Sequence, residues 1–212
     1  MPPKINFSKA AITKIEPLTS EAARWVQIQK IHFNDASGKP RDWEFASRTT
    51  RVPGSDCDGV GILAVLKKPS GPELLLQKQF RPPVGGVCIE VPAGLLDPGE
   101  TLEQCAVREL FEETGYIGKA TRSSPLMFSD PGFCNTNMKL ITVDIDLDDP
   151  RNQNPQSKPE EGEFIETFTV PLKEFSETLR KLESEGFKLD ARVQNVADGF
   201  DLARQYGLFL NK

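Results

Sequence analysis

The sequence has a single histidine, His32, so a zinc site built from several histidines is excluded. A Ser-His-Asp triad would depend on that one residue. Basic residues are also fewer than acidic ones. The sequence has 26 Lys plus Arg and 31 Asp plus Glu, which gives a formal net charge of −5 at pH 7. This balance argues against binding of a nucleic-acid backbone, which requires a basic surface. Any catalytic metal must therefore be held by carboxylates, which favours Mg²⁺, Mn²⁺ or Ca²⁺.

Long apolar runs and paired cysteines are absent as well. The longest apolar runs fall far short of the roughly 20 residues that a membrane-spanning helix needs, so no membrane partner is expected. No C-x-x-C pair occurs, and we expect reduced thiols, three or four of them buried, at Cys57, Cys88, Cys105 and Cys134. The N-terminus lacks the apolar core of a secretory signal and the arginines of a transit peptide. A cytoplasmic protein is therefore expected, with the nucleus and the mitochondrion left open.

The 212 residues are enough to bury roughly 70% of the unfolded surface, so one domain with a small addition is expected. Apolar and polar residues alternate in the N-terminal third, which predicts strands over 10–17, 24–33 and 41–48. The last two strands should form a hairpin across the turn at 35–39. We therefore expect a small antiparallel β unit over residues 1–55, followed by the main domain over residues 56–212.

The main domain mixes strand and helix patterns. Strands are expected over 60–66, 73–80, 88–91, 139–146 and 163–171, helices over 102–114, 172–185 and 191–206, and loops over 92–99 and 148–161. The first helix has the clearest boundaries, because Thr101 and Gln104 form a capping-box pattern and Gly115 stands where a helix-ending glycine belongs. The mixture predicts an α+β or mixed-sheet sandwich.

Three glutamates of this helix, Glu109, Glu112 and Glu113, are spaced i, i+3 and i+4 and should be neighbours. The expected buried arc lies roughly opposite and contains Ala106, Val107, Leu110 and Phe111. Neighbouring like charges destabilise a helix by a few tenths of a kcal/mol per pair, and the last helical turn favours cations. A divalent cation reverses this effect, because oxygen ligands at i and i+4 can converge on one ion. The alternative is a solvated acidic surface, which the preceding glycine loop makes a poorer explanation.

Residues 94–116 resemble the Nudix box, G-x5-E-x7-R-E-U-x-E-E-x-G-U, in which U is bulky and apolar. The fixed positions are all matched, by Gly94, Glu100, Arg108, Glu109, Leu110, Glu112, Glu113 and Gly115. Tyr116 departs mildly, since an aliphatic residue is more usual there. The resemblance implies an α/β/α sandwich with a mixed sheet and hydrolysis of a nucleoside diphosphate linked to another group.

The same resemblance implies a metal site. Mg²⁺, with Mn²⁺ as the alternative, would be held by Glu109 and Glu113, with Glu112 also close and the backbone carbonyl of Ala93 as a further ligand. Arg108 then belongs to the catalytic set, and together with Glu100 it would orient these ligands. Taken alone, Glu100 could equally be a first-turn acid that the helix dipole favours.

Residues outside the box resemble the ADP-ribose pyrophosphatase branch, in its eukaryotic form. Residues 79–83 match Q-x-R-x-P, residues 90–94 match E-x-P-A-G, and Pro131 stands where this branch has a proline. The resemblance covers residues 25–192 and implies hydrolysis of ADP-ribose to AMP and ribose 5-phosphate.

By this resemblance, several residues bind the substrate: Arg48 and Arg81 contact the diphosphate and sugars, Glu90 binds the terminal ribose, and Leu95 and Asp130 also reach the substrate. The chemistry agrees, because arginine binds a diphosphate with two parallel hydrogen bonds, as lysine does not. An ordinary surface ion pair is the alternative for either arginine.

The two tryptophans, Trp25 and Trp43, fall on opposite arms of the expected hairpin. They are either half-buried core residues or an aromatic clamp on adenine, because flat rings stack on bases. In the related enzymes the two rings come from different subunits. The resemblance therefore predicts a homodimer with interlocked N-terminal units.

Glu163 follows the long polar loop, and by resemblance it helps to activate or position the attacking water. Glu166 is the second candidate, a solvated loop acid is the alternative, and His32 is expected to be structural. Two other functions stay open. One is a Nudix hydrolase that prefers another ADP-sugar or an oxidised nucleoside diphosphate, and the other is a catalytically silent ADP-ribose sensor.

Overall fold

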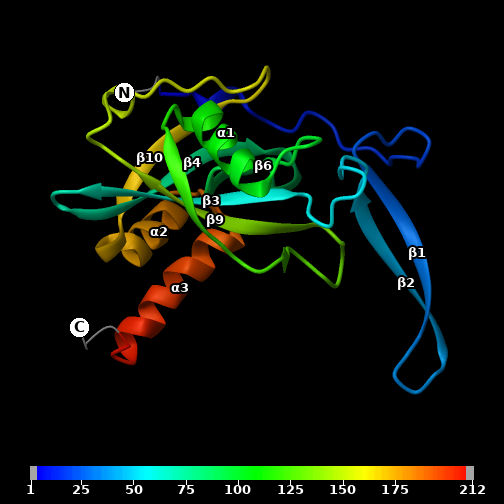
Figure 1. Cartoon of the computed structure of the whole chain (residues 1–212). Helices are drawn as coiled ribbons and strands as arrows, with labels where there is room; N and C mark the ends of the chain where they lie inside the picture. The colour runs from blue at the N-terminus through cyan, green and yellow to red at the C-terminus, as the bar shows by residue number, and fades with distance from the viewer. Residues whose placement is uncertain (1–3, 209–212) are drawn as a thin grey trace.

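The computed structural model describes residues 4–208. A mixed β-sheet lies between two layers of helices, and a hairpin projects away from it (Figure 1). Helix α1 (Leu102–Thr114) packs on one face of the sheet, whereas α2 (Phe175–Ser184) and α3 (Ala191–Gln205) pack on the other. This is the α/β/α sandwich expected from the sequence.

The strands of the sheet are β3 (Gly59–Lys68), β4 (Gly71–Arg81), β5 (Gly86–Glu90), β6 (Ala93–Leu95), β7 (Gly118–Ser123), β8 (Met127–Phe128), β9 (Asn137–Ile145), β10 (Ile165–Pro171) and β11 (Lys188–Leu189). Their order is β11-β5-β4-β3-β9-β7, with β10 paired to β4, β6 to β3 and β8 to β9. The pairs β3–β9 and β11–β5 are parallel and the other pairs are antiparallel. The strands expected in the main domain are present, and β7, β8, β11 and the short β6 within the expected loop were not predicted.

Two hydrophobic clusters fill the space between the layers, and the alternation of β4 divides its side chains between them. Leu75 packs under α1, whereas Leu74 and Leu76 pack with α2 and α3. The next position in the row that faces α1 is Gln77, which is 0% exposed. A polar strip, made by Gln77 of β4 and the paired Glu90 of β5, therefore begins under the C-terminal half of α1.

Helix α1 begins and ends as predicted. The Thr101 hydroxyl accepts a hydrogen bond from the Gln104 N–H at 3.2 Å, and the Gln104 amide oxygen accepts one from the Thr101 N–H at 2.8 Å. Gly115 closes the helix with φ of 77°, a left-handed conformation that glycine adopts without steric cost.

The predicted faces of α1 are partly wrong. Glu113 is 3% exposed beside the buried Leu110, whereas Val107 and Phe111 are only partly buried. The reason lies in the sheet, which presents Gln77 rather than an apolar side chain to this part of the helix. The carboxylates therefore do not form one exposed stripe opposite the core.

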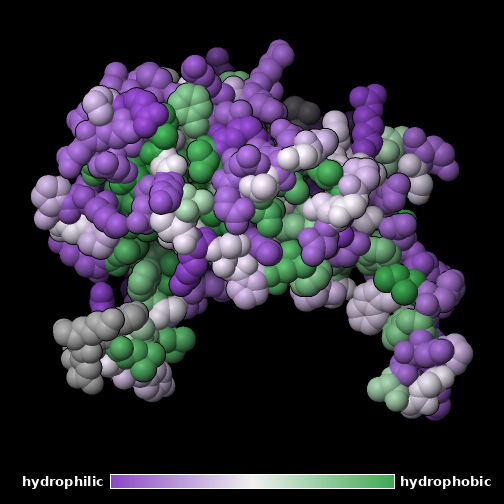
Figure 2. Space-filling view, in the orientation of Figure 1, coloured by the Kyte–Doolittle hydropathy of each residue, from purple (hydrophilic) through white to green (hydrophobic). Residues whose placement is uncertain are grey.

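The predicted hairpin is present as β1 (Val26–Asn34) and β2 (Pro40–Arg48), paired along their whole length as a separate two-stranded sheet. Apolar side chains are scattered over its surface (Figure 2), and Ile28 is 75% exposed. It is tied to the sandwich near its base, where Ala46 exchanges backbone hydrogen bonds with Phe133 and Asn135 and the Trp43 indole donates to the Gly132 carbonyl. The domain boundary at residue 55 stays a prediction.

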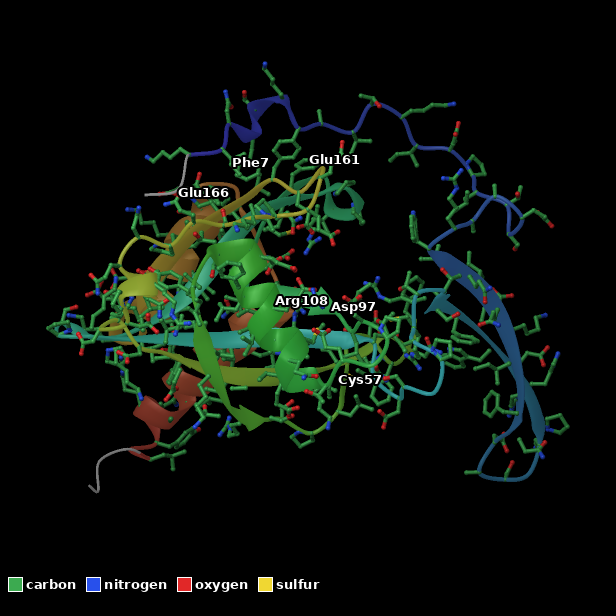
Figure 3. All side chains as sticks on the ribbon, turned by 45° about the horizontal axis from the view of Figure 1, so that its top comes forward. Phe7, Cys57, Asp97, Arg108, Glu161 and Glu166 are labelled. Atoms are coloured by element: carbon green, nitrogen blue, oxygen red, sulfur yellow. The ribbon has the colours of Figure 1, made fainter. Side chains whose placement is uncertain are left out.

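The expectation of a strand over residues 10–17 is wrong. These residues have no regular secondary structure, and a short 3₁₀ helix (Phe7–Lys9) precedes them. The alternating pattern finds no sheet edge to pair with, and nearly all of the segment is exposed. Further toward the N-terminus, the Ile5 N–H donates to the carboxylate of Glu166, which is labelled in Figure 3.

The thiols behave as expected, since Cys57, Cys88 and Cys105 are buried, Cys134 is partly buried, and all four are free. Within residues 4–208, no helix combines the length and apolar character that crossing a membrane would require.

Candidate active site

Arg108 on α1 connects the helix to the loop that precedes it. Its guanidinium donates two hydrogen bonds to Glu100, both at 2.9 Å, one to Glu109 at 2.9 Å and one to Glu112 at 3.0 Å. Asp97, labelled beside it in Figure 3, lies 3.7 Å away. The hydrogen bonds to Glu100 are the largest cause of the raised pKa of Arg108. One permanently charged group thus fixes the orientation of three carboxylates.

Glu113 is the most buried of the helix carboxylates. Its Oε1 accepts a hydrogen bond from the Gln77 amide at 3.2 Å, and its Oε2 accepts one from the Ala93 N–H at 3.0 Å. Burial raises the pKa of Glu113 to about 8 despite these two donors, and the charges of Glu109 and Glu163 act in the same direction. Within residues 4–208, no cationic side chain forms an ion pair with this carboxylate.

Glu109 lies directly against the backbone of Gly94. A Cβ added to that glycine would be 1.8 Å from the Glu109 carboxyl carbon, so no other residue fits there without moving Glu109. Burial raises the pKa of Glu109, Arg108 opposes this effect, and the charges of Glu112 and Glu163 add to it. The first glycine of the box therefore makes room for one of its glutamates.

Glu163 lies in the turn before β10, where its carboxylate accepts a hydrogen bond from the Glu160 N–H at 3.1 Å. Its charge acts on both buried helix carboxylates, so the fold brings it toward them although it is far away in sequence. Glu166, the second candidate, is occupied elsewhere, because Lys78 donates to it at 3.0 Å. Glu163 therefore stays the first candidate of the two.

Within the described part of the chain, no three His, Cys, Asp or Glu side chains converge on a point that could hold a metal ion. Each of the three helix carboxylates already has a hydrogen-bond donor, because Arg108 donates to Glu109 and Glu112 and Gln77 donates to Glu113. The donor set nevertheless fits a hard cation, because a buried carboxylate without a cationic partner lies within electrostatic range of two others. A divalent ion with oxygen ligands would offset that excess negative charge.

A second cluster of charges lies across β4 and β5. Arg81 donates two hydrogen bonds to Glu90, at 2.8 and 2.6 Å, and Glu90 is 4% exposed. Next to it, Arg192 donates to Asp190 at 2.7 and 2.6 Å. The sequence analysis had missed Asp190 and Arg192, whose position beside Glu90 follows from the pairing of β11 with β5. Arg81 and Glu90, which are both predicted to bind the substrate, are bound to each other in this structure.

The two tryptophans are exposed, Trp25 by 68% and Trp43 by 51%. Trp43 lies opposite Ile31 in the hairpin, whereas the Trp25 carbonyl accepts a hydrogen bond from the Thr49 N–H at the hairpin base. Six positions separate Trp25 from Ile31, which at about 3.3 Å per residue corresponds to about 20 Å. Two rings that sandwich one base must be about 7 Å apart, which is much less than the separation of these two backbone positions.

The remaining candidates lie nearby or on the hairpin. Arg48 is exposed at the end of β2, and Leu95, the second residue of the box, is 38% exposed. Asp130 begins the turn whose Gly132 carbonyl accepts a hydrogen bond from the Trp43 indole at 3.1 Å. His32 is exposed on the hairpin and interacts with Asp42 across the strands at 2.6 Å. It lies outside the carboxylate cluster.

Comparisons with known proteins show which family the chain belongs to. A model of the NUDIX domain matches residues 58–192. An ADP-ribose pyrophosphatase of Saccharomyces cerevisiae is 55% identical over 185 residues, which cover 86% of this chain and 80% of that protein. An ADP-sugar pyrophosphatase of Mus musculus is 41% identical over 84% of this chain and 82% of that protein. A crystal structure of an ADP compounds hydrolase has a TM-score of 0.54 at 18% identity over 84% of this chain and 86% of that one, which concerns the fold alone. The chain therefore belongs to the Nudix family of hydrolases.

Proposed function

We propose that this Nudix hydrolase cleaves the diphosphate bond of ADP-ribose to give AMP and ribose 5-phosphate. The observation that carries the proposal is the 55% identity with a yeast ADP-ribose pyrophosphatase over 86% of the chain. The spatial arrangement supports it, because the carboxylate cluster and the Arg81–Glu90 pair are joined by Gln77, which touches Glu113 and lies opposite Glu90. Anion and cation binding groups are thus adjacent, as a diphosphate hydrolase requires.

Nudix hydrolases use a divalent metal ion, and we infer Mg²⁺, with Mn²⁺ as a substitute. When bound, such an ion neutralises diphosphate charge and lowers the pKa of a water molecule. Glu109, Glu112, Glu113 and the Ala93 carbonyl would hold it, while Arg108 keeps the first two carboxylates in place.

Glu163 would accept the proton of the attacking water or orient that water by a hydrogen bond. Its position in a turn supports this role, because a turn can adjust to the substrate more readily than a strand can.

Arg81 and Arg48 would bind the diphosphate, and Glu90 would accept hydrogen bonds from the hydroxyls of the terminal ribose. Leu95 and Asp130 would complete the substrate pocket. Because Arg81 and Glu90 now bind each other, the substrate must replace their mutual contact with one to phosphate and one to ribose. Arg81 and Glu90 would thus each have a hydrogen-bond partner both before and after the substrate binds.

We further propose a homodimer in which Trp25 of one chain and Trp43 of the partner chain clamp the adenine. The separation of about 20 Å between the backbone positions of the two tryptophans along one hairpin supports a clamp made by two chains. Exposed apolar residues on the hairpin supply a surface to bury, and they are Trp25, Val26, Ile28, Ile31, Phe33 and Trp43. An isolated two-stranded hairpin is marginally stable in water, which also favours a partner.

The proposal is tested by incubating the protein with ADP-ribose, with and without Mg²⁺, and measuring AMP by chromatography. AMP should form only with the metal, and Glu109→Gln should abolish turnover while the protein stays folded. Glu103→Gln is the matched control, since Glu103 is an exposed glutamate of the same helix that makes no contact with the cluster. Full activity of Glu109→Gln would contradict the metal role, and absence of AMP would contradict the substrate.

Another ADP-sugar is the second candidate substrate, favoured by the name of the mouse relative. Values of kcat/KM for ADP-ribose, other ADP-sugars and an oxidised nucleoside diphosphate, measured in competition, rank these substrates. A silent sensor would bind ADP-ribose and release no AMP.

A further inference from the structure

Gln77 is a polar residue in a position that the fold would ordinarily give to an apolar one. It continues the row of β4 side chains that face α1, after Leu75, and it is 0% exposed. Its amide nitrogen donates to Glu113, but among the described residues its Oε1 has no hydrogen-bond partner. A buried amide that is only half satisfied costs folding free energy, so folding alone does not explain its presence.

A second buried amide shows what a purely structural role looks like. Asn152 is 4% exposed, and its side chain donates to the carbonyls of Ile117 and Asp146 and accepts from the Ile117 N–H. All of its polar atoms are used to hold a loop against β7 and β9. Gln77, by contrast, makes one side-chain contact, and that contact is to a carboxylate of the Nudix box.

The surroundings of Gln77 link the two halves of the site. In the sheet it lies opposite Glu90 on β5 and Thr167 on β10, and directly paired residues of antiparallel strands project on the same face. Glu113 reaches the same strip from α1, where the Ala93 N–H holds its other oxygen at 3.0 Å. Each oxygen of Glu113 therefore has one donor, one from a side chain and one from the backbone.

We propose that Gln77 is a positioning residue that fixes the Glu113 carboxylate, on the sheet side, in the orientation in which it binds the divalent metal ion. This inference rests on the proposed role of Glu113 as a metal ligand. An apolar side chain of the same length would fill the space but leave Glu113 Oε1 without a donor and free to rotate. Groups that orient metal ligands in this way typically contribute 10- to 100-fold in metal affinity or activity, as an order of magnitude.

The test is Gln77→Met, which keeps the length of the side chain and removes the donor. Binding of Mn²⁺ without substrate, followed by electron paramagnetic resonance, should weaken by about 10- to 100-fold. The rate constant kcat should fall similarly, whereas KM for ADP-ribose should change little, because Gln77 does not contact the substrate. The unfolding temperature of the metal-free protein should stay close to that of the wild type, since the unpaired oxygen is removed as well.

Leu179→Ala is the control for lost stability. Leu179 is 0% exposed in the cluster on the other face of the sheet, so this variant should unfold at a lower temperature and bind Mn²⁺ normally. Unchanged Mn²⁺ affinity in folded Gln77→Met overturns the inference. If that variant does not fold, Gln77→Asn, which withdraws the amide by one methylene, is measured with the same expectations. Weakened Mn²⁺ binding in a protein that does not hydrolyse ADP-ribose would support the inference and reject only the substrate.

Discussion

Gly94 shows how one missing side chain shapes the site. Because an added Cβ would lie 1.8 Å from the Glu109 carboxyl carbon, Gly94→Ala must displace that carboxylate. We expect kcat to fall by a factor of about 100 or more, which is the order of effect that misplacing a catalytic group by 1 Å produces. The measurement is steady-state hydrolysis of ADP-ribose, together with an unfolding curve to establish that the variant is folded.

Gly99 is the control for this substitution. Its φ is 82°, and no atom lies within 4 Å of an added Cβ, so Gly99→Ala introduces left-handed strain of about 1–2 kcal/mol without a collision. It should lower stability and keep most of the activity. Equal activity of the two variants would show that the approach of Glu109 to Gly94 is unimportant.

Residues of the site could be predicted where their spacing along one helix fixes their relation. Glu109, Glu112 and Arg108 lie on α1, and their hydrogen bonds depend on helical geometry alone. Gln77 and Arg192 could not be found in this way, because the register of β4 with β5 and of β11 with β5 brings them to the site. Sheet register is set by contacts far apart in the sequence, which no local pattern contains.

The same distinction applies to whole elements. Helix α1 was predicted to the residue because the capping box and Gly115 are local signals. The strand expected over residues 10–17 fails because alternation does not create a partner strand. Strand β7 was missed because its side chains are mostly exposed, and its pairing with β9 is what makes it a strand.

The segment between the hairpin and β3 is held by a further ion pair, which the sequence did not reveal. Arg51 donates to both oxygens of Asp58, at 2.8 and 2.9 Å, and to the Asn135 carbonyl at 2.9 Å. Burial alone would raise the pKa of Asp58, but the hydrogen bonds from Arg51 and from the Asn137 N–H outweigh it and lower that pKa below 3.8. The ionised form is therefore stabilised by folding.

We expect Asp58→Asn to lower the free energy of unfolding by about 3 kcal/mol at pH 7, because it leaves a partly buried guanidinium without its counterion. A carboxyl whose pKa is lowered on folding contributes stability above its unfolded pKa and loses it as the pH falls through the folded value. The gap between wild type and variant should thus be constant from pH 7 to about 5 and close below 3.8. Urea unfolding over this pH range measures it, and a gap that did not narrow as the pH falls below 3.8 would contradict the ion pair.

For the molecule as a whole, the hairpin is the part that the fold of one chain does not explain. Within the described residues it forms a separate two-stranded sheet, and the backbone positions of its two exposed tryptophans lie about 20 Å apart along the strands. In a symmetric dimer each site would combine one ring from each chain, so the two sites share the two hairpins. Trp25→Ala and Trp43→Ala should each damage both sites of a homodimer, raising KM for ADP-ribose.

Mixing these two variants distinguishes a clamp formed by two chains from a clamp formed by one chain. In a mixed dimer, one site would lack both rings and the other would keep both. After unfolding and refolding of an equal mixture, about half of the dimers are mixed, so about one quarter of all sites should regain wild-type KM. If both rings of a site came from one chain, every site in the mixture would lack one ring and no activity would return. Refolded wild type mixed with refolded Trp25→Ala is the control for the yield. Wild-type KM returns only if the protein is a dimer and each site is shared between its two chains. This one mixing experiment therefore tests the assembly and the adenine site at the same time.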